Sequence, residues 1–158
     1  MELSFTEIEI AWLAGLIEGE GSFGLDARSA KRYKVSTAPP SPYLRIAMTD
    51  QDIIERVSKL VKKTYFSPKR RTVTEKQVYI VHVGDRATLS RVLPQLFPHF
   101  GKRRQQAVQK CLDALDDWEV WYAAGNRGEM AKQGVLSKKP MASKSFDMMP
   151  PDVLKDIL

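Results

Sequence analysis

The stretch LAGLIEGEG, residues 13–21, carries more information about this chain than any other part of it. A glycine inside a helix costs about 1 kcal/mol relative to alanine, so Gly15 and Gly19 need a structural reason. Residues four apart share one face of a helix, and Ala11, Gly15 and Gly19 therefore form a stripe of small side chains. Such a stripe lets a second backbone approach closely. The same helix delivers Glu18 and Glu20 to its end, which suggests a cation there.

The sequence also predicts where this helix begins. Thr6 and Glu9 have the Thr-x-x-Glu spacing of a capping box, and Phe5 and Ile10 are spaced for a hydrophobic staple. We therefore expect a helix that is capped by Thr6 and runs to about Gly19.

The remaining pattern predicts two hairpins, each followed by a helix. We expect strands over 22–26 and 43–48, a helix capped by Thr49 or Asp50, strands over 64–71 and 77–83, a helix capped by Asp85 that ends or kinks at Pro94, and a helix over about 102–122. The side chains expected to face the core are Phe23, Leu25, Leu44, Ile46, Met48, Val78 and Ile80, whereas Gln77 and Tyr79 should face away. This order predicts an α+β fold with an antiparallel sheet and helices on one face.

Composition limits the class of protein. The 158 residues suit one domain, and the net charge is +6. The first 24 residues hold five glutamates and no lysine or arginine, so the rest of the chain is strongly basic, as a phosphate-binding surface would be. Cys111 is the only cysteine, which excludes a disulfide framework and a zinc cluster. Without a secretory signal or an apolar run of about 20 residues, we expect an intracellular, soluble protein of the cytoplasm or an organelle matrix, with no membrane partner.

The nonapeptide resembles the defining motif of the LAGLIDADG homing endonucleases, with Glu18, Gly19 and Glu20 in place of Asp, Ala and Asp. The resemblance implies an αββαββα core, whose four-stranded, saddle-like antiparallel sheet binds DNA and whose helices cover the opposite face. The resemblance covers roughly residues 5–122, so we expect an endonuclease domain over residues 1–124. After Gly125 the composition changes to Gly, Lys, Ser and Met, and we expect a C-terminal extension over 125–158 with a short terminal helix starting near Asp152.

The chain carries one motif, because the best second candidate, residues 112–117, lacks every glycine. In this family one motif is half of a site. The resemblance therefore implies a homodimer about a twofold axis. The residues implied at its interface are Ala11, Trp12, Gly15, Leu16 and Gly19.

In that family the second acid of each motif binds divalent metal between the paired helices. Carried over, Glu20 is the ligand, Gly19 lends its backbone carbonyl, and Glu18 serves the helix end. The implied cofactor is Mg²⁺, with Mn²⁺ as an alternative and Ca²⁺ as a substitute that does not support cleavage.

Two further positions are implied for catalysis. The first is a basic residue at the start of the long helix in this family. Lys102 matches it by residue type and Arg103 by its distance from Ala107. The alternative role of either residue is contact with a phosphate. Asp50 lies where relatives place a polar residue that orders water, and a helix cap is its alternative role.

Recognition of double-stranded DNA would fall to the sheet face without helices, because a two-stranded ribbon fits a major groove. The residues expected to reach bases are Asp26, Arg28, Arg45, Gln77 and Tyr79. Those expected near phosphates are Lys31, Arg32, Lys34, Lys69, Arg70, Arg71 and Lys76, and each could instead be a solvated surface charge.

The function implied by the resemblance is site-specific, double-strand cleavage of a long pseudo-palindromic DNA target that leaves 3′ overhangs, by an intron-encoded enzyme. Two alternatives use the same fold. One is an RNA-binding maturase that assists intron splicing, and the other is a DNA-binding regulator that does not cut.

Overall fold

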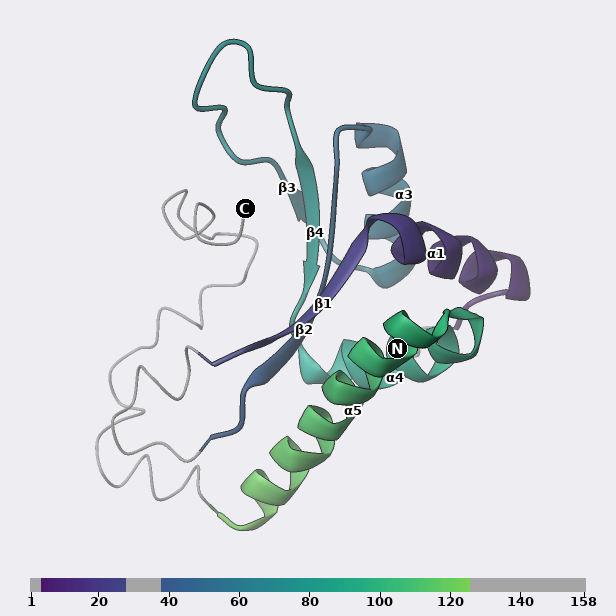
Figure 1. The fold of residues 1–158 in the computed structure, drawn as a ribbon, viewed down its shortest axis with the longest axis vertical. Coiled ribbons are helices and arrows are strands. Elements are labelled where there is room, and N and C mark those ends of the chain that lie inside the picture. Colours follow the sequence, from purple (N-terminus) through teal and green to yellow (C-terminus); the bar gives the residue numbers. More distant parts are fainter. Residues whose placement is uncertain (1–3, 28–37, 126–158) are drawn as a thin grey trace.

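The computed structural model describes residues 4–27 and 38–125. The elements are α1 (Glu7–Glu20), β1 (Gly21–Asp26), β2 (Ser41–Met48), α3 (Gln51–Val61), β3 (Tyr65–Phe66), β4 (Tyr79–Val83), α4 (Arg86–Leu96), the short 3-10 helix η1 (Phe97–His99) and α5 (Lys102–Ala123). The strands form one antiparallel sheet in the order β1-β2-β4-β3. The α-helices of the described residues all lie on one side of this sheet (Figure 1). The predicted element order and α+β class are confirmed.

Helix α1 begins and ends for identifiable reasons. The Thr6 side chain accepts a hydrogen bond from the backbone N–H of Glu9 at 3.1 Å, as the predicted cap requires. At the other end the chain turns directly into β1 at Gly21, whose N–H bonds to the carbonyl of Ile17. A Cβ on Gly21 would lie 2.6 Å from Cγ2 of Ile17 and 2.9 Å from its carbonyl oxygen. Only glycine fits this turn.

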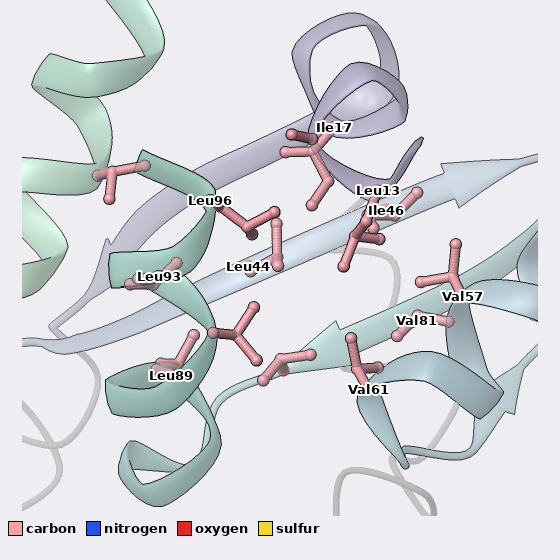
Figure 2. Close-up of a cluster of buried hydrophobic side chains, with 14 of the residues drawn as sticks. Leu13, Ile17, Leu44, Ile46, Val57, Val61, Val81, Leu89, Leu93 and Leu96 are labelled. Carbon is pink, nitrogen blue, oxygen red and sulfur yellow. The ribbon is translucent and has the colours of Figure 1, made fainter. Parts of the chain in front are cut away.

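The core lies between the sheet and the helices (Figure 2). Leu13 and Ile17 of α1 meet Leu44 and Ile46 of β2, and all four are at most 1% exposed. The other labelled side chains come from α3, β4 and α4: Val57, Val61, Val81, Leu89, Leu93 and Leu96. The sequence predicted the core-facing residues of β2 correctly, because Leu44, Ile46 and Met48 follow strand spacing.

The predicted facing of β4 is wrong. Pairing of Ile46 with Val81 and of Met48 with Tyr79 places Tyr79, Val81 and Val83 on the helix side of the sheet. Tyr79 packs against the core there, whereas Ile80 belongs to the opposite face. The physical reason is register, since a shift of one residue exchanges the two faces of a strand.

Three other expectations need correction. Strand β3 has two residues rather than eight, because Pro68 has no N–H to continue the ladder. Leu25 lies near the end of β1 and is 42% exposed instead of buried. Of the two effects predicted for Pro94, an end of the helix is wrong, because α4 continues past it to Leu96.

Several expectations lie outside the described residues. These concern Arg28, Lys31, Arg32 and Lys34 in the connection after β1, and the terminal helix near Asp152. Within the described ranges, no helix combines the length and apolar character needed to cross a bilayer.

Candidate active site

Glu20 is the last residue of α1, and its side chain is exposed, as is the neighbouring residue Gly19. Because Gly21 allows an immediate turn into β1, this carboxylate stands at the corner between the helix layer and the sheet. An acid at a helix C-terminus is disfavoured by the helix dipole. The position therefore suits a carboxylate whose charge is neutralised by something other than its own helix.

The small-residue stripe of α1 faces outward. Ala11, Gly15 and Gly19 are all exposed, and a Cβ added at Gly15 or Gly19 would meet no atom within 4 Å. Ile8, about one turn before Ala11, is 78% exposed. Nothing in the described part of the chain therefore requires these glycines, although each weakens the helix.

Trp12 and Leu16 lie beside the stripe rather than in it. Both side chains are half-buried and pack against the core. The guanidinium of Arg56, from α3, lies 3.8 Å from the centroid of the Trp12 ring. Trp12 thus presents a face already covered by a cation–π contact inside its own chain.

The start of α5 packs against the end of α1. Nη2 of Arg104 donates a hydrogen bond to the backbone oxygen of Glu18 at 3.1 Å. A Cβ on Gly101 would lie 3.0 Å from Oε1 of Glu18, so this carboxylate lies at the N-terminus of α5. The two contacts bring the basic start of α5, with Lys102 and Arg103, to the corner where Glu20 stands.

Lys102 and Arg103 are both exposed at that corner. Arg103 lines a groove of about 470 Å³ between α5 and β1. The groove is lined by Phe23, Gly24, Leu25, Arg103, Gln106, Ala107, Lys110 and Cys111. Arg104, which the sequence did not single out, is the member of this cluster that contacts the motif helix.

Asp50 belongs to the same end of the sheet. Gly21, at the start of β1, pairs with Ile46 near the end of β2, and Asp50 lies two residues after the last residue of β2. Asp50 is the N-cap of α3 but makes no side-chain capping hydrogen bond. Its exposed carboxylate is therefore not committed to the cap, which was its alternative role.

The sheet face away from the helices carries an aromatic pair. Tyr43 of β2 and His82 of β4 stack with ring centroids 5.3 Å apart and an interplanar angle of 22°. The Tyr43 ring leans over Gly24 of β1, where a Cβ would come within 2.3 Å of the phenol oxygen. Arg45 lies next to this pair, in register with His82 and with Ser22. Partial burial lowers the pKa of Arg45.

The sequence placed Arg45 on this face, and that placement is confirmed by the register. It left His82 without a role, because the predicted inward facing of Ile80 would have turned His82 toward the core, whereas pairing with β2 places it beside Arg45. Tyr79 is the reverse case, because it was expected here and lies on the helix side. The partners of Tyr79 are the core and Tyr65, whose ring meets it edge to face at 6.2 Å.

The remaining expected DNA contacts divide by location. Asp26 is half-buried at the far end of β1. The side-chain amide of Gln77 donates a hydrogen bond to the Ser67 hydroxyl and another, at 3.1 Å, to the carbonyl of Pro68. Gln77 therefore joins the two arms of the β3–β4 hairpin. Four exposed cations follow β3 in a connection that projects beyond the sheet (Figure 1): Lys69, Arg70, Arg71 and Lys76. This connection extends from the end of the sheet where Glu20 stands, since Tyr79 pairs with Met48.

The donors at the corner are hard oxygens: the Glu20 carboxylate and backbone carbonyls of the last turn of α1. These are the ligands that Mg²⁺, Mn²⁺ and Ca²⁺ prefer. No group of three or more His, Cys, Asp or Glu side chains able to hold a metal exists among residues 4–27 and 38–125. The donor set fits a hard cation only when a second set of ligands joins it.

Neither a protein-family model nor a curated protein matches this sequence. Among solved structures, the homing endonuclease I-TnaI is similar at a TM-score of 0.50 and 18% identity, over 99% of this chain and 96% of that one. The LAGLIDADG meganuclease I-CpaMI, bound to uncleaved DNA, is similar at a TM-score of 0.52 and 17% identity, over 84% and 43%. A mutant of I-SmaMI is similar at a TM-score of 0.54 and 14% identity, over 87% and 47%. This chain therefore has the fold of the LAGLIDADG homing endonucleases, the family whose motif its first helix resembles.

Proposed function

We propose that this protein is a homodimeric, site-specific DNA endonuclease in which Glu20 of each chain binds a divalent metal. The observation that carries the proposal is the geometry of α1. Its stripe of small residues is open, and the exposed carboxylate lies at the end of that stripe. Pairing of two copies through Ala11, Gly15 and Gly19 would bring two Glu20 side chains together.

The lengths of the similar chains support pairing. This chain spans nearly the whole of I-TnaI but less than half of I-CpaMI and of the I-SmaMI mutant. A unit that fills less than half of a longer chain of the same fold is consistent with two units per complete site. The I-CpaMI meganuclease was crystallised with uncleaved DNA bound, which supports DNA as the substrate class.

The proposed chemistry follows from the residues at the corner. Glu20 and the Gly19 carbonyl would hold Mg²⁺, which supplies charge neutralisation and an activated water for phosphodiester hydrolysis. Lys102 and Arg103 would stabilise negative charge on the phosphate. Asp50 has an exposed carboxylate, uncommitted to the cap, that can order water.

DNA recognition is proposed for the sheet face and the connection after β3. Arg45, beside Tyr43 and His82, would contact bases from the sheet, and the four cations after β3 would contact phosphates. The proposed target is a long pseudo-palindrome, because a symmetric dimer reads two related half-sites. Cleavage that leaves 3′ overhangs, and a gene that lies within an intron, are proposed from the family resemblance.

The test begins with a target. A library of randomised duplexes is selected for binding in Ca²⁺, and the selected duplex is placed in a supercoiled plasmid. The wild-type chain should linearise this plasmid with Mg²⁺ and not with EDTA.

Glu20→Gln should bind the duplex unchanged and cut at least ~1,000-fold more slowly, whereas Glu7→Gln at the other end of α1 should cut normally. Tight binding without cleavage by the wild-type chain would indicate the regulator, and selection of structured intron RNA instead of duplex DNA would indicate the maturase.

A further inference from the structure

Two helix ends meet in a reciprocal contact of opposite charges. The guanidinium of Arg104 donates to the backbone oxygen of Glu18, two residues before Glu20. The last carbonyls of a helix have no partner inside it, and the negative end of the helix dipole favours a cation. Arg104 therefore satisfies one carbonyl of the turn that carries Glu20.

The second half of the contact runs the other way. Oε1 of the Glu18 carboxylate lies 3.0 Å from the place that a Cβ on Gly101, the N-cap of α5, would take. The first N–H groups of a helix favour a negative charge. Each helix end thus meets the charge it prefers, and the absence of a Cβ at Gly101 provides the space.

An aromatic contact supports the same junction. Phe23, three residues after Glu20, meets Phe100 edge to face at 5.7 Å, and Phe100 directly precedes Gly101. The turn between α1 and β1 is therefore held against the turn before α5 at two points.

The arginine also has a cost for the stability of the chain. Within the part of the chain that the structure describes, Nε of Arg104 is buried and has no hydrogen-bond partner. A buried donor without a partner destabilises a fold. A methionine would fill similar space without this defect.

We propose that Arg104 is a positioning residue, which together with Glu18 fixes the last turn of α1, and so Glu20, relative to Lys102 and Arg103. This inference rests on the proposed function and adds a residue to it. Arg104 acts through the backbone of Glu18 and not by contact with DNA. Such supporting contacts around metal ligands typically change activity by about 10- to 100-fold.

The first experiment measures single-turnover cleavage of the selected target at saturating protein and Mg²⁺. Arg104→Met should lower the rate by about 10- to 100-fold. The matched control, Lys59→Ala on the exposed side of α3, should cut at the wild-type rate. A wild-type rate in Arg104→Met would overturn the proposal.

The second measurement separates positioning from phosphate contact. Binding of the duplex in Ca²⁺ is measured across a series of salt concentrations. Loss of one phosphate contact would reduce the slope of log K against log[salt] by about 0.9. Positioning predicts an unchanged slope in Arg104→Met, and a reduction of that size would overturn it.

A third measurement needs no cleavage. The backbone N–H of Gly21 bonds to Ile17 at the end of α1, and that of Ile10 bonds to Thr6 at its start. Arg104→Met should increase amide hydrogen exchange at Gly21 by about tenfold or more and leave Ile10 unchanged. If the wild-type chain fails to cut DNA, the proposed function fails, but exchange at Gly21 still tests whether Arg104 fixes the end of α1. An unchanged exchange rate at Gly21 in Arg104→Met would overturn that role.

Discussion

Substitution of Gly15 by alanine should stabilise the single chain and weaken the assembly. Gly15 lies in the interior of α1, and a Cβ there would meet no atom within 4 Å. Removing a helical glycine at an unhindered site stabilises by about 0.5–1 kcal/mol. For a chain of this size, a gain of about 1 kcal/mol raises Tm by roughly 2–4 °C.

The same methyl group should be costly when two α1 helices pack. Extra volume in a close-packed contact costs about 1–3 kcal/mol. That free energy corresponds to a dimer dissociation constant raised roughly 5- to 150-fold. The opposite signs of the two effects distinguish a contact surface from an ordinary exposed helix face.

The assay combines sedimentation equilibrium with urea unfolding at concentrations where the chain is monomeric. Ser90→Ala serves as the control, because it improves an exposed interior position of α4 without touching the stripe. It should raise stability slightly and leave association unchanged. If Gly15→Ala associates as tightly as the wild type, the reasoning about the stripe is refuted. If it destabilises the monomer, the space at Gly15 is not open.

Three more outcomes follow from the described residues. Gly21→Ala should lower the free energy of unfolding by about 1–3 kcal/mol in urea titrations, because its methyl would collide with Ile17; an unchanged midpoint would refute this packing. Burial raises the pKa of Cys111 to about 11, so thiol reagents at neutral pH should label it only after unfolding, and rapid labelling of the folded chain would contradict its burial. Burial alone would raise the pKa of Asp85, but hydrogen bonds from Lys63 and the start of α4 outweigh it, so the pKa lies below its usual value. This stabilisation is present at neutral pH and is lost as the pH falls through the folded-state pKa, so Asp85→Asn should flatten the acid limb of a plot of stability against pH; an unaltered limb would count against the contact.

The sequence predicted the fold well wherever spacing alone decides. Helix α1 is capped at Thr6, and Leu44 and Ile46 share the buried face of β2, as their local patterns indicate. The face of β4 could not be predicted from its own residues, because tyrosine, isoleucine and valine suit either side of a sheet. Pairing with β2 decides it, and that pairing joins segments far apart in the sequence, such as Met48 and Tyr79.

The candidate site was predicted in part. A carboxylate after a stripe of small residues is visible in the sequence, and so is the basic cluster at the start of α5. The role of Arg104 was not, since the sequence contains three adjacent cations and nothing local shows which one reaches Glu18. Gly21, Gly24 and Gly101 were missed for the same reason, because each makes room for a side chain from another position in the chain.

The most direct test of the paired site is a crystal structure of the protein with its selected duplex in Ca²⁺, repeated in Mn²⁺ for its anomalous signal. We expect two chains in contact through Ala11, Gly15 and Gly19, with metal bound by Glu20 of each chain next to the scissile phosphates. A single chain on the duplex, or metal density that does not involve Glu20, would contradict the paired site.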